Sequence, residues 1–147
     1  MTGHREQVLR IERTFDAPAE RVFEAWTSEE VLRRWLHGMP DWETPTAEVD
    51  LRVGGTIRIV MRDPSDGAEA GATGEYTVVE PPHRLVFTWV WDDQPELPQL
   101  IELEFSERDG ATTVLMTNSS IATDELRASQ RRGWNVCYDN LERLLAG

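Results

Sequence analysis

Cysteine is nearly absent from this sequence, which contains only Cys137 among its 147 residues. A single cysteine excludes a disulfide within the chain and a metal site built from several thiolates. Long apolar runs are absent too, since no stretch reaches the roughly 18 apolar residues that indicate a membrane-spanning helix. Residues 1–10 are polar and charged and lack the apolar segment of a secretory signal. We therefore expect a cytoplasmic protein without a membrane partner.

Basic residues are outnumbered by acidic ones. The sequence has 15 Lys and Arg against 27 Asp and Glu, which gives a net charge of −12. Such a charge repels phosphate backbones and anionic lipid surfaces. Three arginines at 127, 131 and 132 form the best candidate for a basic patch, and a solvated helix face explains them more simply. Nucleic acid is therefore not an expected partner.

Residue patterns typical of enzymes and metal proteins are scarce as well. The three histidines, His4, His37 and His83, are scattered without metal-ligand spacing. Residues 119–120 are serines without the flanking glycines of a nucleophile elbow, and no glycine-rich phosphate loop is present. We therefore expect no metal and no cofactor and assign no catalytic residue. An enzymatic activity stays open but is not favoured.

Alternating and helical patterns predict one α+β domain that spans residues 1–147. Two-residue alternation and turn residues predict strands over 7–15, 46–51, 56–62, 73–80, 84–91, 99–106 and 111–118, and helical spacing predicts helices over 19–27, 29–35 and 124–145. Strands joined by short turns pair antiparallel. Helices segregated to one face of such a sheet are typical of α+β folds. The predicted order is β-α-α-β6-α.

One face of the predicted sheet is apolar and rich in aromatic rings. Alternation puts Ile57, Ile59 and Met61 on this face and Arg58 and Arg62 on the other. The C-terminal helix carries a matching apolar stripe and is the only predicted element long enough to cover the sheet. The rings between them form either a solid core or the walls of a cavity. Six tryptophans in a short chain give weight to a cavity, because large rings on a concave sheet leave gaps.

The predicted cavity walls come from the sheet, the helix and one loop. We expect the following ligand-binding residues: Met61, Tyr76, Phe87, Trp89 and Trp91 from the sheet, Trp134, Cys137 and Tyr138 from the helix, and Trp35 and Trp42 at the rim. His37 and Asp41 in the rim loop are candidate polar groups and a candidate acid–base pair. Cys137 fits a small core hydrophobe better than a nucleophile. Gly133 inside the helix indicates the close approach of another group.

Several segments resemble one known family. Residues 15–27 (FDAPAERVFEAWT), 32–35 (LRRW), 50–55 (DLRVGG), 74–76 (GEY) and 81–89 (PPHRLVFTW) resemble the START-like (SRPBCC) superfamily. They are most similar to the bacterial branch related to the activator of the heat-shock-protein-90 ATPase. The resemblance covers about residues 7–146 and implies the helix-grip fold, a curved antiparallel sheet around a long C-terminal helix with an apolar cavity between them. Residues 36–42 depart in detail from the branch, which affects the pocket entrance.

The resemblance implies three functional hypotheses, because the superfamily includes lipid carriers, hormone receptors, polyketide cyclases and the chaperone activator domain. The first is binding of a small, largely hydrophobic ligand in the aromatic cavity. The second is a cyclase-like or hydrolase-like enzyme that uses His37, Asp41 or Tyr76. The third is a chaperone-interaction domain of the ATPase-activator type. Apolar residues on the outer sheet face leave both a monomer and a homodimer open.

Overall fold

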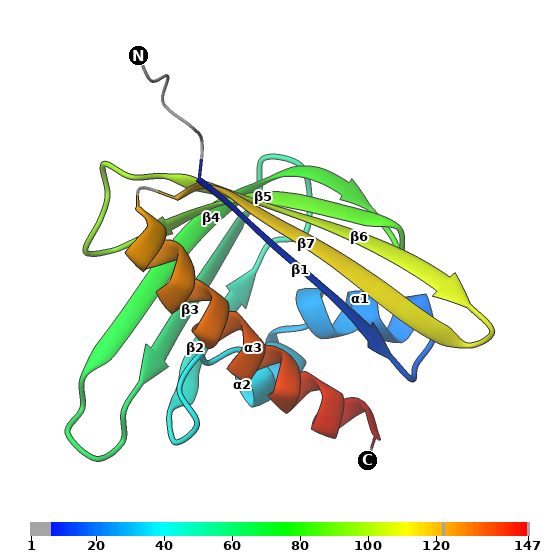
Figure 1. The fold of residues 1–147 in the computed structure, drawn as a ribbon, viewed down its shortest axis with the longest axis horizontal. Helices are drawn as coiled ribbons and strands as arrows, with labels where there is room; N and C mark the ends of the chain where they lie inside the picture. The colour runs from blue at the N-terminus through cyan, green and yellow to red at the C-terminus, as the bar shows by residue number, and fades with distance from the viewer. Residues whose placement is uncertain (1–6, 122, 147) are drawn as a thin grey trace.

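The computed structural model describes residues 7–121 and 123–146 and has the α+β fold predicted above (Figure 1). Its elements are β1 (Gln7–Phe15), α1 (Ala19–Thr27), α2 (Glu29–Trp35), β2 (Glu43–Val49), β3 (Thr56–Arg62), β4 (Glu69–Glu80), β5 (Arg84–Trp91), β6 (Gln99–Arg108), β7 (Ala111–Ile121) and α3 (Asp124–Ala146). This order confirms the helix-grip arrangement. Among the described helices, none combines the length and the apolar character needed to cross a membrane.

The described strands form one antiparallel sheet in the order β1-β7-β6-β5-β4-β3-β2. The first strand therefore lies beside the last, with Ile11 opposite Met116. A register shift between Tyr76 and Val78 marks a bulge in β4, and bulges bend a strand locally. Figure 1 shows the sheet curving around α3, which packs along β1, β7 and α2.

Capping groups in the sequence fix where the helices begin. Ser28 precedes α2, and its side-chain oxygen accepts a hydrogen bond from the Val31 N–H at 3.4 Å. Thr123 precedes α3, and its hydroxyl oxygen accepts from the Leu126 N–H at 3.0 Å. Such caps satisfy backbone donors that the helix itself leaves free. Serine and threonine are favoured N-cap residues, so the residue type at both positions agrees with the observed helix starts.

Strands β4, β6 and β7 extend beyond the ranges that the alternation predicts, β2 spans 43–49 rather than 46–51, and β4 differs most. It begins at Glu69, whereas residues 63–71 read as a flexible loop in the sequence. Ala70 and Gly71 pair with Met61 and Val60 of β3. Backbone hydrogen bonds do not depend on the side chain, so this small-residue segment joins the sheet despite its low strand propensity. The extension places the β4 backbone along the pocket described below.

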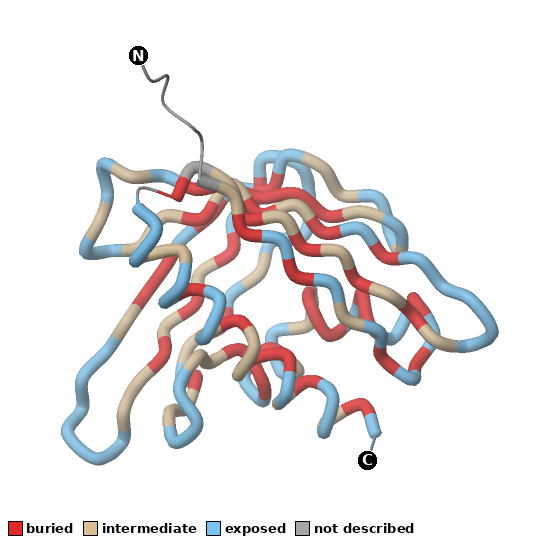
Figure 2. Tube along the Cα trace, in the orientation of Figure 1, coloured by how far each residue is buried: buried red, intermediate tan, exposed pale blue. Residues whose placement is uncertain are grey.

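A continuous apolar core fills the concave side of the sheet. Figure 2 shows buried residues alternating with exposed ones along the strands and α3. Trp26 of α1 lies at the centre of this core, with ring centroids 4.8 Å from Trp35, 5.8 Å from Trp134 and 6.2 Å from Phe87. The buried residues of α3 are Gln130, Trp134, Cys137, Tyr138, Leu141 and Leu145, as the predicted stripe requires.

Candidate functional site

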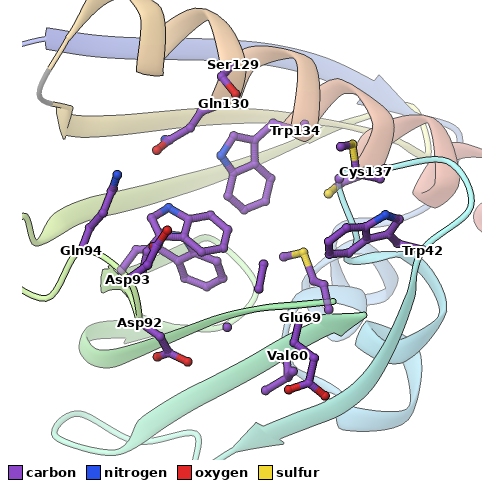
Figure 3. Close-up of a pocket in the computed structure, with 18 of the residues that line it drawn as sticks. Trp42, Val60, Glu69, Asp92, Asp93, Gln94, Ser129, Gln130, Trp134 and Cys137 are labelled. Atoms are coloured by element: carbon purple, nitrogen blue, oxygen red, sulfur yellow. The ribbon is translucent and has the colours of Figure 1, made fainter. Parts of the chain in front are cut away.

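A pocket of about 680 Å³ lies between α3, strands β3 to β5 and the α2–β2 loop (Figure 3). It is lined by Gly38, Met39 and Trp42 of the loop, Arg58, Val60 and Met61 of β3, Glu69, Ala70 and Gly71 of β4, Trp89 and Trp91 of β5, Asp92, Asp93 and Gln94 after β5, and Leu126, Ser129, Gln130, Arg132, Gly133, Trp134 and Cys137 of α3. This volume falls within the range of about 300–1,000 Å³ that small-molecule sites occupy.

Four indole rings contribute to the apolar wall of the pocket. Trp89 lies edge-on to Trp91 with centroids 5.5 Å apart, and 5.9 Å from Trp134 of α3. Trp42 packs against the core from the loop side, and Figure 3 shows it on the same side of the pocket as Cys137, away from Gln94 and Gln130. Rings of this size offer large apolar area with few rotatable bonds. The wall therefore suits a flat or elongated apolar molecule.

The structure brings six of the ten predicted wall residues to the pocket. They are Trp42, Met61, Trp89, Trp91, Trp134 and Cys137. Trp35, Tyr76, Phe87 and Tyr138 lie instead in the packed core, each no more than 1% exposed. The alternation assigned the correct sheet face. It does not show where along each strand the packed core ends and the pocket begins.

Specific contacts hold two of these four rings inside the core. The Trp35 indole N–H donates to the carbonyl of Ala25 at 2.9 Å. The Tyr138 hydroxyl donates to the sulfur of Met116 at 3.4 Å. Trp35 and Tyr138 stack on one another, with centroids 6.2 Å apart and ring planes at 17°. This stack ties α2 to α3 and leaves neither ring free to line the pocket.

The polar loop residues do not form the candidate acid–base pair. His37 and Asp41, both described, are absent from the pocket lining, and neither hydrogen bonds nor forms an ion pair with the other. His37 Nδ1 lies 3.0 Å from Thr44 Oγ1, which itself donates to the Leu36 carbonyl at 2.8 Å. The Thr44 hydroxyl proton is thereby used, so His37 Nδ1 is the donor of this pair. Burial lowers the pKa of His37, which keeps it neutral.

The Cys137 thiol and two tyrosine hydroxyls near the pocket are held in their neutral forms. Burial raises the pKa of the Cys137 thiol, although this residue borders the pocket. Burial likewise raises the pKa of the Tyr138 and Tyr76 hydroxyls. A thiol in its neutral form is a poor nucleophile. Among the described residues, no cluster of three or more His, Cys, Asp or Glu could hold a metal ion.

Buried amides at one end of the pocket were missed by the sequence reasoning. The Gln130 side chain on α3 exchanges two hydrogen bonds with Gln99 on β6, at 2.9 and 3.0 Å. The apolar stripe of the helix included Gln130 without assigning it a polar role. The sequence feature that could have indicated this pair is a glutamine within an apolar stripe, because a buried amide requires a hydrogen-bond partner.

Charged side chains lie at the exposed edge of the pocket. Arg58 forms two hydrogen bonds with the carboxylate of Asp92, at 2.7 and 2.8 Å, and these bonds lower the pKa of Asp92. Val60 lies opposite Gly71, so both face away from Met61 and the buried side of the sheet. Figure 3 shows Val60, Glu69 and Asp92 below the strands, away from Trp134. The charged lining residues therefore lie apart from the apolar interior of the pocket.

A direct backbone contact joins the α2–β2 loop to α3. A Cβ atom on Gly38 would lie 3.1 Å from the Cα atom of Gly133, closer than ordinary packing allows. The Asn140 side chain also donates to the carbonyls of Trp35 and His37, at 3.3 and 3.5 Å. The close approach expected at Gly133 is therefore found, and its partner is a second glycine. These contacts position Met39 and Trp42 at the pocket edge.

Comparisons with known proteins give a consistent result. The family model described as Activator of Hsp90 ATPase homolog 1-like protein matches residues 16–146. The solution NMR structure of the AHSA1-like protein from Aeromonas hydrophila is 32% identical, with a TM-score of 0.78, and the match covers 93% of this chain and 90% of that one. A crystal structure of a protein from Rhodobacter sphaeroides is 29% identical, with a TM-score of 0.81, and the match covers 95% and 92%. No curated protein shows significant sequence similarity to the chain.

Proposed function

The chain belongs to the family of Activator of Hsp90 ATPase homolog 1-like proteins, and from this premise we propose that it binds a small, largely apolar molecule in the pocket between α3 and the sheet. The observation that carries the proposal is the pocket of about 680 Å³ bordered by Trp42, Trp89, Trp91 and Trp134. A solid core at this place would leave no such volume. The family relationship supports a domain of the ligand-binding SRPBCC type.

The free energy gained by burying the apolar surface of a ligand supports binding in this pocket. A ligand that buries about 300 Å² of apolar surface gains on the order of 7 kcal/mol at about 25 cal/mol per Å². Loss of translational and rotational freedom offsets part of this gain. The indoles of Trp89 and Trp134 are already buried and held by the core, so little further ordering is required of them. A 1 μM dissociation constant corresponds to about 8 kcal/mol, so we expect weaker binding, with dissociation constants above about 10 μM for a well-matched ligand.

The contacts around the pocket support binding more than turnover. Of the three candidate catalytic groups, Tyr76 is fully buried, His37 is occupied by Thr44, and Asp41 is exposed. A general acid or base has to reach the reacting atoms within hydrogen-bond distance. The proposal therefore assigns no reaction to the pocket.

The test is a titration of the ¹⁵N-labelled protein with lauric acid, a monoacylglycerol and naphthalene, followed by NMR. We expect backbone shifts at Gly71, Leu126 and Gly133, which line the pocket, and none at Val53 and Glu75, which lie exposed elsewhere. Shifts confined to exposed residues, or no shifts with any compound, would contradict the proposal.

A second candidate function is contact with an Hsp90-type chaperone. Its support is the family match over residues 16–146 and the exposed apolar side chains of Met39, Leu51 and Val53, which are 53%, 39% and 63% exposed. Stimulation of the chaperone ATPase by the chain, lost on Val53→Asp, would favour this candidate. Unchanged ATPase activity at saturating protein would remove it.

A further inference from the structure

One end of the pocket is polar, while the rest of its interior is apolar. Figure 3 shows Gln94 and Gln130 at the same end, away from Trp42 and Cys137. Gln130 is paired with Gln99 by two hydrogen bonds. On the sheet, Gln99 lies directly opposite Trp89, so these two side chains share one face. We call Trp89, Gln94, Gln99 and Gln130 the amide end of the pocket.

Two groups of the amide end lack hydrogen-bond partners among the described residues. They are the indole N–H of Trp89, which is a donor, and the side-chain carbonyl oxygen of Gln94, which is an acceptor. Both atoms are buried, and both residues line the pocket. Buried polar groups are paired in almost all native proteins. A donor and an acceptor without partners at the border of one pocket together point to a ligand that supplies both.

The charges around the pocket restrict what this ligand group can be. The four residues of the amide end carry no formal charge. The ionisable side chains among the pocket-lining residues are Arg58, Glu69, Asp92, Asp93 and Arg132, all partly or largely exposed. An ionised group at the amide end would therefore be buried without a counter-charge, which is costly. A neutral group that both donates and accepts fits this end.

We propose that the amide end recognises an uncharged carboxamide-like group, with the ligand's apolar body lying against Trp91, Trp134 and Trp42. The ligand carbonyl accepts from the Trp89 indole N–H, and the ligand N–H donates to the Gln94 carbonyl oxygen. Carboxamides, lactams and similar neutral head groups belong to this class. The inference rests on the proposed binding function and adds the polar group that the ligand carries.

Three probes with the same ring system test the inference: 2-naphthamide, 2-isopropylnaphthalene and 2-naphthoate. Their affinities are measured by NMR titration at neutral pH, where the carboxylate is ionised. We expect the amide to bind most tightly and to move the indole N–H signal of Trp89. We expect its advantage over the hydrocarbon to fall about tenfold in Gln94→Met and in Trp89→Phe, which each remove one hydrogen bond.

The matched control is Trp42→Phe, the same substitution at the opposite end of the pocket. It should weaken the amide and the hydrocarbon alike and preserve the ratio of their affinities. Gln94→Met changes a half-buried loop residue, so it keeps the test decisive if Trp89→Phe does not fold. Equal ratios in Gln94→Met and Trp42→Phe, or tightest binding by the carboxylate, would overturn the inference and leave the proposed function standing. Failure of all three probes to bind would overturn the proposed function itself.

Discussion

The side-chain amides of Gln99 on β6 and Gln130 on α3 form two reciprocal hydrogen bonds, at 2.9 and 3.0 Å. Gln99 is 2% and Gln130 8% exposed, so the pair is removed from water. It is the one direct polar link that the described residues show between the first half of α3 and the central strands. Because α3 packs most closely along β1, β7 and α2, this link holds the helix over the pocket.

Replacing both members of the pair should cost less than the two single replacements added together. Gln130→Met leaves the Gln99 amide buried without a partner, which costs about 1–3 kcal/mol of unfolding free energy. Gln99→Met has the same effect on Gln130. The double variant removes both polar groups and should lose less than the sum of the singles, by at least about 1 kcal/mol. Urea unfolding of the four proteins measures this coupling, and strictly additive losses would show that the pair is not formed.

A second prediction contrasts two buried polar residues on β7. Asn118 is fully buried, and neither amide atom has a partner among the described residues. Asn118→Leu should therefore raise the unfolding free energy by about 1 kcal/mol. Thr112 is equally buried but donates to the Ala17 carbonyl at 2.7 Å, so Thr112→Val should lower it by about 1 kcal/mol. Chemical denaturation distinguishes the signs, and destabilisation by Asn118→Leu would mean that Asn118 is partnered in solution.

The glycine contact between the loop and α3 gives a third prediction. Gly38→Ala places a Cβ atom 3.1 Å from the Gly133 backbone, so the loop must move away from the helix. Gly133→Ala meets its nearest atoms only at 3.9 Å, and it gains about 0.5–1 kcal/mol of helix propensity. We expect Gly38→Ala to destabilise the protein and Gly133→Ala to stabilise it. Faster hydrogen exchange in residues 38–42 of the first variant alone would locate the effect, and equal effects of both variants would contradict it.

The fourth prediction concerns pH. Burial lowers the pKa of His37 below its usual value of 6.5. At acidic pH the folded protein then binds fewer protons than the unfolded chain. The contribution of His37 to the unfolding free energy is therefore fully present above pH 6.5 and is lost as the pH falls toward the folded-state pKa. His37→Asn retains an N–H donor for Thr44 but does not titrate. Its unfolding free energy, measured from about pH 5 to about pH 8, should change less with pH than that of the native protein. An identical pH dependence would show that His37 does not contribute.

Much of the fold was predictable because its signals are local. The caps at Ser28 and Thr123 and the stripe on α3 follow from residue type and spacing, and the structure confirms them. Alternation also assigned the correct buried face of β3, with Ile57, Ile59 and Met61 inward. The start of β4 was missed because Ala70 and Gly71 have weak strand propensity and pair only through their backbones.

The pocket was only partly predictable, because its boundary depends on packing between distant segments. Trp89 and Phe87 lie two residues apart on the same face of β5, yet only Trp89 borders the pocket. Phe87 is enclosed by Tyr76 and Trp26, with centroids 5.8 and 6.2 Å away. Neither neighbour is adjacent in the sequence, so no local pattern separates the two rings. The Gln94 and Gln99 amides were missed for the same reason.

A large side chain placed inside the pocket tests directly whether the ligand binds there. Ala70 lines the pocket and lies opposite Met61, on the same face of the sheet. Ala70→Trp should occupy much of the volume, whereas Glu75→Trp adds the same ring at an exposed position of the same strand, remote from the pocket. The measurement is the affinity of both variants for 2-naphthamide by NMR titration. We expect binding to be lost in Ala70→Trp and unchanged in Glu75→Trp, and equal binding by the two variants would contradict a binding site in this pocket.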